Sequence, residues 1–442
     1  MNGRLLHLAA LLLAMLLLCG AARAEDFYDR MPAALAAKQT TETSSVNGPL
    51  KLKRTYPKTS CTQVDAEIRA LVDAMAEAAV LRAKAEGAEL VDVGATISRS
   101  GTSFMSFLTI AETTAGTELL HAEFDARVYD METGVRVALS DVLEAGGAGY
   151  DMLAQAVRVQ LGAAFPAEEA DAAALDALCT REALDSAAFT LGAASLVLTY
   201  RADDVYPGHQ TLLHVRVPYA QLRPEMTALG QAQTDNSRFR MVALTYDDGS
   251  AQKITSALLD QLRRYGAQAT FFILGERIEK NHNVIARQQN AGHSVQTHTY
   301  AHHYTWELSQ AEKLDERDRF AGALGAFTGV PPTLMRAPGG NEEGYDMGYP
   351  LIHWSLATGD SSNDNVEEIA ERVKWSVRDG TIVLMHDINN NCPRYTQRIL
   401  ESLTSQGFLL VSVEELFLDA GIALEPGKVY YSTTRVEELG EE

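Results

Sequence analysis

Two neighbouring carboxylates, Asp247 and Asp248, follow a short apolar segment in the stretch "LTYDDGS". Asp-Asp-Gly is ordinary turn chemistry, because aspartate side chains accept hydrogen bonds from nearby backbone and glycine tolerates positive φ. Two acids at the end of a strand can also divide a catalytic task, because adjacent strand residues point in different directions. The rest of the chain has to decide between a turn and a catalytic pair.

A pair of histidines supplies the first further evidence. His298 and His302 stand four residues apart in "HTYAHHY", a spacing that places both imidazoles on one face if the segment is helical. Such pairs often occur by chance. Two histidines and one carboxylate are, however, the three protein ligands of a catalytic zinc site, and Asp248 can supply the carboxylate.

Three more polar side chains follow other apolar segments. Arg336 lies in "MRAPGG", Asp360 ends "HWSLATGD", and His386 lies in "VLMHD". Taken singly, they fit a salt-bridged arginine, a helix-capping aspartate and a buried histidine. Because the strands of a βα barrel carry their active-site residues at one common end, their joint occurrence indicates a single site.

The elements that must position these residues alternate between strand and helix patterns across residues 239–420. The strand candidates are "MVALTY", "ATFFIL", "HSVQTH", "TLMRA", "LIHWSL", "TIVLMH" and "FLLVSV", with helical patterns between most of them. This alternation predicts an α/β fold with a parallel sheet, and seven such units favour a closed or distorted (β/α) barrel.

The preceding part of the chain has a different rhythm. Residues 60–227 begin with an amphipathic helix and continue with alternating strands such as "HAEFDARVYD", which predicts a smaller α+β domain with an antiparallel sheet. We expect residues 25–59 to be a linker and residues 421–442 an acidic tail. A change of composition near residues 228–238 marks the boundary, so a fragment starting near Asn236 is expected to fold alone and to keep some activity.

Five segments in order, "TYDDG", "HTYAH", "RAPGG", "WSLATGD" and "LMH", resemble the motifs of a polysaccharide deacetylase of carbohydrate esterase family 4, the NodB-homology domain. The resemblance covers about two fifths of the chain. Residues 60–227 more loosely resemble the extracellular domain of lysozyme-sensing anti-sigma factors, which also precedes the catalytic domain in some peptidoglycan deacetylases.

The resemblance implies a division of labour among the polar residues. Asp248, His298 and His302 would hold a divalent metal, foremost Zn2+, with Co2+ or Mn2+ as alternatives. Asp247 would act as the general base, and Arg336 would keep it ionised and oriented.

The remaining implied roles concern the leaving group and the substrate. His386 would be the general acid, with its pKa raised by Asp360. The N–H of Gly339 would help to stabilise the oxyanion. The implied substrate contacts are Pro338, Gly339, Trp354 and Leu384, of which Leu384 and Trp354 would enclose the acetyl methyl group.

The chain departs from the family pattern without losing a metal ligand, the base or the acid. The departures are Tyr246, Ala337, Gly339, Ala357 and Ser361. We expect a hydrolase that removes N-acetyl groups from peptidoglycan N-acetylglucosamine or N-acetylmuramic acid. The alternatives are a chitooligosaccharide deacetylase, an acetylxylan esterase, and a sensor of the wall or of a lysozyme-type protein with a vestigial barrel.

The N-terminus and the net charge bear on location and partners. Residues 1–24 have the pattern of a secretory signal that is cut after Ala24, which predicts a secreted or cell-surface protein. A lipid on Cys19 and an uncleaved membrane anchor are the weaker alternatives. The net charge of −21 disfavours nucleic acid as a partner. Cys61 and Cys179 can form a bridge, or all three remaining cysteines are free.

Overall fold

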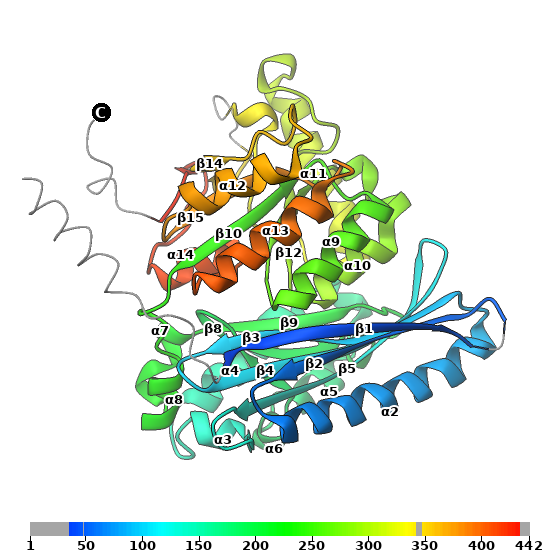
Figure 1. The fold of residues 1–442 in the computed structure, drawn as a ribbon, viewed down its shortest axis with the longest axis vertical. Helices are drawn as coiled ribbons and strands as arrows, with labels where there is room; N and C mark the ends of the chain where they lie inside the picture. Colours follow the sequence, from blue (N-terminus) through cyan, green and yellow to red (C-terminus); the bar gives the residue numbers. More distant parts are fainter. Residues whose placement is uncertain (1–34, 47, 342–346, 434–442) are drawn as a thin grey trace, which may run out of the picture.

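The computed structural model describes residues 35–46, 48–341 and 347–433. Residues 1–24, the predicted signal, lie outside the described part. The described chain forms two layers of structure, with the second domain above the sheet of the first (Figure 1). No helix in the described ranges is long and apolar enough to cross a membrane.

The first domain is built on a six-stranded sheet in the order β1-β2-β3-β4-β5-β6. Its strands are β1 (Ala37–Ser45), β2 (Lys51–Thr59), β3 (Leu90–Ser100), β4 (Phe104–Ala115), β5 (Glu118–Asp130) and β6 (Val135–Val137). Only β2 and β3 pair in parallel, because the long helix α2 (Thr62–Glu86) connects them. The predicted antiparallel sheet is therefore present, with one parallel pair inside it.

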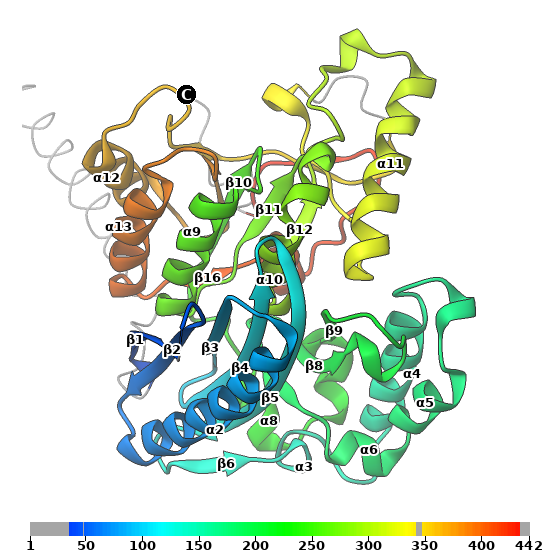
Figure 2. The ribbon, with the colours of Figure 1, turned by 90° about the vertical axis from the view of Figure 1, so that its right-hand side faces the viewer.

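Helix α2 covers the face of this sheet that points away from the second domain (Figure 2). Its buried side chains recur every three to four residues, as helical periodicity requires. They are Val64, Ile68, Val72, Ala76, Ala79 and Ala83. Leu71 and Met75, two further apolar residues of this helix, pack against the same core and are only partly buried.

The rest of the first domain packs beside this sheet. A three-stranded antiparallel sheet and several short helices share one apolar core. The elements are α3 (Leu139–Val142), α4 (Gly149–Gly162), α5 (Ala172–Leu178), α6 (Arg181–Asp185), β7 (Phe189–Leu191), β8 (Ser195–Arg201), β9 (Leu212–Pro218), α7 (Tyr219–Leu222) and α8 (Ala228–Gln233). Cys179 packs against this core and Cys61 against the core under α2, so both are free thiols, as is Cys392.

The second domain alternates strands and helices, as predicted. Its strands are β10 (Met241–Asp247), β11 (Thr270–Ile273), β12 (Ser294–Thr297), β13 (Leu351–Ile352), β14 (Leu356–Ala357), β15 (Thr381–His386), β16 (Leu409–Val411) and β17 (Val429–Tyr430). Its helices are α9 (Gln252–Tyr265), α10 (His282–Asn290), α11 (Gln310–Thr328), α12 (Val366–Ser376), α13 (Cys392–Ser405) and α14 (Val413–Asp419).

Parallel pairing orders the central strands β12-β11-β10-β15-β14, and β16 pairs with the first half of β10. Beyond β12 the pairing continues only through single bridges at Met335, so the candidate "TLMRA" is not a regular strand. The parallel sheet and its helices make a distorted barrel that is not closed by a continuous ladder.

Two predicted boundaries are wrong. Residues 37–59, expected as a linker, form β1 and β2 of the first sheet. Part of the expected C-terminal tail also belongs to the fold, because β17 pairs with β13 and Ser432 bridges to Thr381. Residues 434–442 lie outside the described residues.

The two domains meet through charged side chains on the sheet face opposite α2. Asp92 of β3 is 3% exposed and lies 3.0 Å from Arg263 of α9 and 3.3 Å from Arg287 of α10. Lys53 of β2 lies 3.1 Å from Asp92 and also contacts Asp260 of α9. The pKa of Asp92 is well below its usual range, because the three cations outweigh the effect of its burial. The sheet and helices thus form one continuous structure.

Candidate active site

Side chains alternate between the two faces of strand β10, and this alternation directs Asp247 into the barrel. Val242, Leu244 and Tyr246 face the helices and join their apolar core. The alternate residues face inward, so Asp247, the last residue of the strand, points into the barrel with 3% of its surface exposed. Asp248 follows outside the strand.

Asp248 lies against the predicted histidines. Its Oδ1 is 3.5 Å from Nε2 of His298 and 3.4 Å from Nε2 of His302. One ligand atom from each of these three residues falls within 4.8 Å of the others. Oδ1 of Asp248 is buried without a hydrogen-bond partner among the described residues, as expected of an oxygen intended for a metal.

The protonation of His298 agrees with a ligand role. Its Nδ1 lies 2.9 Å from the carbonyl oxygen of Arg336, so this nitrogen carries the proton and donates it. Nε2 is then left with its lone pair toward Asp248, the arrangement usual for a metal-binding histidine. Burial also lowers the pKa of His298 and favours the neutral ring that a metal needs. The three residues therefore fit a divalent metal.

His298 and His302 lie in a loop. The four-residue spacing would have placed them on one face only in a helix, so another backbone shape brings them together here. The backbone there is strained, because Thr299 and His302 have φ of 69° and 61°, and Asp248 has φ of 68°. These are the only non-glycine residues with positive φ in the described ranges. Strain of this kind persists where the surroundings enforce it, commonly at functional sites.

Arg336 fixes Asp247 from inside the barrel. Arg336 is 1% exposed and donates from Nη1 to Oδ1 of Asp247 at 2.8 Å and to Oγ1 of Thr245 at 2.6 Å. Its other donors bind the carbonyl oxygens of Ile352 and His353, both at 2.9 Å. A guanidinium held at four points leaves Asp247 little freedom to turn.

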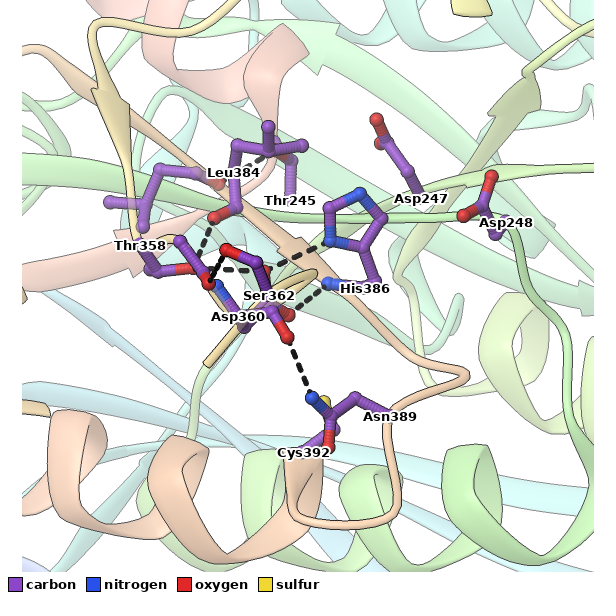
Figure 3. Close-up of polar contacts among 12 residues, drawn as sticks. Thr245, Asp247, Asp248, Thr358, Asp360, Ser362, Leu384, His386, Asn389 and Cys392 are labelled. Atoms are coloured by element: carbon purple, nitrogen blue, oxygen red, sulfur yellow. Dashed lines mark hydrogen bonds and ion pairs between the residues drawn. The ribbon is translucent and has the colours of Figure 1, made fainter. Parts of the chain in front are cut away.

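Asp360 and His386 form the opposite side of the site (Figure 3). Nδ1 of the His386 ring lies 2.9 Å from Oδ1 of Asp360. Oδ2 of Asp360 accepts a hydrogen bond from the backbone N–H of His386 at 2.8 Å. Burial disfavours the charged imidazole of His386. The neighbouring carboxylates outweigh burial, Asp360 most and then Asp247 and Asp248, and raise the pKa of His386 to about 9. Figure 3 shows the His386 ring between Asp360 and the two neighbouring aspartates.

The predicted substrate contacts lie around the same end of the barrel. Pro338 and Gly339 belong to a tight turn directly after Arg336, and Gly339 has φ of 65°, which favours glycine. The ring of Trp354 lies close to Gly340 and 5.7 Å from the Arg336 guanidinium. Leu384 lies two residues before His386 on β15 and is 9% exposed.

Sequence reasoning missed three residues that hold the predicted ones in place. Thr245 binds Arg336, as described above. Tyr395 donates its hydroxyl to Oδ2 of Asp360 at 2.6 Å, and Thr358 donates to Oδ1 at 3.0 Å. The inward face of β10 could have indicated Thr245, whereas Tyr395 fits the apolar stripe of α13 and gives no separate signal.

A cavity of about 1070 Å³ lies elsewhere, between the two domains. Residues such as Arg99, Arg216 and Leu409 line it, and none of the predicted catalytic residues does. Leu409 pairs with Met241 at the opposite end of β10 from Asp247. The site is therefore assigned from the chemistry of its side chains and not from cavity size.

Comparison with known proteins shows which family the chain resembles. A model of the polysaccharide deacetylase family matches residues 234–346. The peptidoglycan-N-acetylglucosamine deacetylase PgdA of Listeria monocytogenes is 34% identical over 198 residues, 44% of this chain and 42% of that protein. A peptidoglycan-N-acetylglucosamine deacetylase of Bacillus cereus is 35% identical over 189 residues, 40% of this chain and 88% of that protein.

Among solved structures, the peptidoglycan deacetylase PdaC from Bacillus subtilis is 31% identical, with 41% of this chain and 92% of that one covered and a TM-score of 0.40. The match to a nearly complete relative shows that this chain belongs to the polysaccharide deacetylase family. The chain spans about two fifths of the length of the first curated relatives, PgdA and PdaC.

Proposed function

We propose that this protein is a metal-dependent N-deacetylase that hydrolyses acetamide groups of cell-wall glycan and releases acetate. One observation carries the proposal. A metal-competent trio, Asp248, His298 and His302, lies beside an arginine-held carboxylate, Asp247. A carboxylate-paired histidine, His386, lies on the other side.

The metal that best suits two histidines and one carboxylate is zinc, and Co2+ and Mn2+ are the alternatives. A relative in the family, an acetyl xylan esterase from Clostridium thermocellum, was solved with a cobalt ion. When bound, the metal supplies Lewis-acid polarisation of the acetamide carbonyl and makes water more acidic.

Asp247 is the proposed general base. It takes a proton from the attacking water, and Arg336 holds its other oxygen, so that one oxygen stays directed toward the site. Arg336 also pairs its positive charge with the buried carboxylate of Asp247, at 2.8 Å. The N–H of Gly339, in the turn after Arg336, is the proposed donor to the oxyanion.

His386 is the proposed general acid. The sugar amine must leave with a proton, and His386 carries one at neutral pH because its pKa is raised to about 9 despite burial. Asp360 binds Nδ1, so Nε2 is the atom that can deliver the proton. Leu384 and Trp354 remain the proposed enclosure for the acetyl methyl group.

Peptidoglycan is the proposed substrate, at either N-acetylglucosamine or N-acetylmuramic acid. Relatives with each of these activities in their names match 44% and 43% of the chain, respectively. A chitin deacetylase and a bifunctional xylanase/deacetylase also match, so chitooligosaccharide and acetylxylan are the alternative substrates. An enzyme that acts on the cell wall must be located outside the cytoplasm, which agrees with the export signal expected in residues 1–24.

A sensor with a vestigial barrel is the non-enzymatic alternative. The complete and mutually oriented set of ligands, base and acid argues against it. The first domain also has one sheet face covered by α2 and the other occupied by α9 and α10. These contacts favour a supporting role for that domain over recognition of a lysozyme-type protein through its sheet.

The test is acetate release from peptidoglycan, N-acetylglucosamine oligomers and acetylxylan by the zinc-loaded full chain. Mass spectrometry of the muropeptides then identifies the deacetylated sugar. We expect acetate from peptidoglycan. Release from acetylxylan alone would select the esterase alternative, and no release from any polymer would contradict the enzymatic proposal.

A further inference from the structure

A pair of stacked aromatic rings extends outward from the metal-binding loop. The Tyr304 and Trp306 rings lie 4.6 Å apart with an interplanar angle of 5°. On its inner side, Tyr304 meets the ring of the proposed ligand His302 edge-on, with 5.9 Å between the centroids. The rings therefore form a row that begins at the metal site and ends at Trp306.

Tyr304 is fixed against the catalytic turn. A Cβ atom placed on Gly339 would lie 2.9 Å from Cε1 of Tyr304, so the ring rests directly on the Gly339 backbone. The Tyr304 N–H donates to Oε2 of Glu307 at 2.8 Å, which holds the turn that carries Trp306. The position of the pair is thus set by contacts with the site itself.

Trp306 is 65% exposed although it is a large apolar side chain. Exposure alone does not mark a site, since single exposed hydrophobic residues are common. Trp375 on α12 is 68% exposed, but its Nε1–H donates to Glu371 at 2.6 Å and Lys374 lies over its ring. Trp306 has one face covered by Tyr304, and the exposed remainder adjoins the candidate active site.

We propose that Trp306 is a sugar-binding platform for the pyranose ring next to the one that is deacetylated. The proposal rests on the function proposed above and adds to it a subsite for the glycan chain. A pyranose has an apolar C–H face and polar edges, so it packs on a flat aromatic ring and keeps its hydroxyl groups in water. Because Tyr304 lies between Trp306 and the metal ligands, the platform is one ring further out and contacts the neighbouring sugar.

The kinetic test compares N-acetylglucosamine oligomers of two and five sugars. Trp306→Ala should raise KM for the five-sugar oligomer about fivefold to tenfold, as expected for the loss of an aromatic stack. KM for the two-sugar oligomer should rise less, so the ratio of the five-sugar KM to the two-sugar KM increases. Trp306→Phe should restore most of the loss, and Trp375→Ala is the matched control. An unchanged KM ratio in Trp306→Ala would overturn the platform.

A binding experiment separates this proposal from the catalytic one. The chain has three tryptophans, so 5-fluorotryptophan labelling gives three 19F signals, and Trp306→Phe identifies one of them. In the Asp247→Asn variant, the five-sugar oligomer should shift the Trp306 signal. A shift without acetate release by the unmutated protein would leave the platform standing and refute the deacetylase. No shift with the oligomer, or a shift only with peptide-bearing muropeptides, would overturn the sugar assignment.

Discussion

At the scale of single residues, the neighbouring acids Asp247 and Asp248 face different partners. Asp247 lies inside the barrel on Arg336, while Asp248 points its free oxygen to two histidines. Asp248→Asn should therefore lose most of its bound metal, because an amide is a poorer ligand than a carboxylate. Asp247→Asn should keep the metal and lose roughly 10²–10⁴-fold in rate, the range for removal of a general base.

Elemental analysis of the two purified variants, beside their acetate release, checks this division. His386→Ala should behave like Asp247→Asn, because it removes an acid and no ligand. Metal loss in Asp247→Asn together with full metal and activity in Asp248→Asn would show that the assigned roles are reversed.

The pH dependence follows from His386. Burial opposes its charge, yet Asp360 and the acids of the site raise its pKa to about 9, so activity should fall as the pH rises through the alkaline range. A bound metal offsets the charges of Asp247 and Asp248, which places the midpoint below that value in the loaded enzyme. Asp360→Asn should move the alkaline limb of kcat/KM to lower pH by roughly one to three units.

Ser362→Ala is the control for this shift, because Ser362 lies near Asp360 but its hydroxyl donates to the carbonyl oxygen of Gly359, at 3.4 Å. Profiles of kcat/KM against pH for both variants give the answer. If the alkaline limb of kcat/KM lies at the same pH in Asp360→Asn and in the unmutated enzyme, Asp360 does not set the proton affinity of His386.

The structure brings the proposed catalytic and metal-binding residues to one end of the barrel. This gathering could be predicted because each residue follows an apolar segment and the order of the segments fits one barrel. The residues that position them could not. Tyr395 reads in the sequence as part of the apolar face of α13, and only the packed structure brings its hydroxyl to Asp360. A hydrogen bond between residues 35 positions apart leaves no local pattern.

At the scale of elements, helix α11 holds the loop that carries the proposed metal ligands His298 and His302. Glu316 of this helix is 4% exposed and accepts from the N–H groups of Tyr300 and Ala301 at 2.8 and 2.9 Å. Nδ1 of His303 also lies 3.1 Å from its side chain. Glu316→Ala should weaken metal affinity by about 10–100-fold, because the loop that presents His298 and His302 loses its support.

Competition with a chelator measures this loss. Glu316→Gln keeps one carbonyl acceptor and should lose less affinity than the alanine variant. Asp315→Asn on the same helix is the matched control, because Asp315 is 66% exposed and forms a surface ion pair with Arg319. Equal metal affinity in Glu316→Ala and Asp315→Asn would contradict a role for α11 in holding the loop.

The first element of the fold shows where sequence patterns fail. β1 has the sequence "AKQTTETSS", and only Gln39 within it is buried. An edge strand exposed on both faces has no apolar alternation, so its sequence resembles a linker. Its strand conformation comes from antiparallel pairing with β2 along its whole length.

At the scale of the whole molecule, the two domains share an interface that no pattern in the sequence predicted. Gly101 donates to Oδ1 of Asn236 at 2.9 Å, and Nδ2 of Asn236 donates to the carbonyl oxygen of Ala193 at 2.8 Å. Glu415 of α14 also accepts from the Ala194 N–H at 2.5 Å. A fragment starting near Asn236 would lose these partners and expose α9 and α10, so the structure argues against the expected independent folding.

The charged cluster at this interface provides the last prediction. Asp92 is buried and contacts Lys53, Arg263 and Arg287, so Asp92→Asn would take the central anion from three cations that are only 13–16% exposed. We expect the free energy of unfolding to fall by about 3–5 kcal/mol, the usual cost of removing one partner from a buried ion pair. Because these cations come from both domains, the loss should lower the stability of the whole chain in one urea transition.

Asp176→Asn is the control, because Asp176 and its partner Arg158 are 70% and 53% exposed. Such a surface pair is worth about 0–1 kcal/mol, so this variant should unfold close to the unmutated chain. Tryptophan fluorescence follows only the second domain, since all three tryptophans lie there, and far-ultraviolet circular dichroism follows both. If the two signals give separate midpoints and Asp92→Asn shifts neither, the domains fold independently, and the first domain is a module joined to the deacetylase and not part of its support.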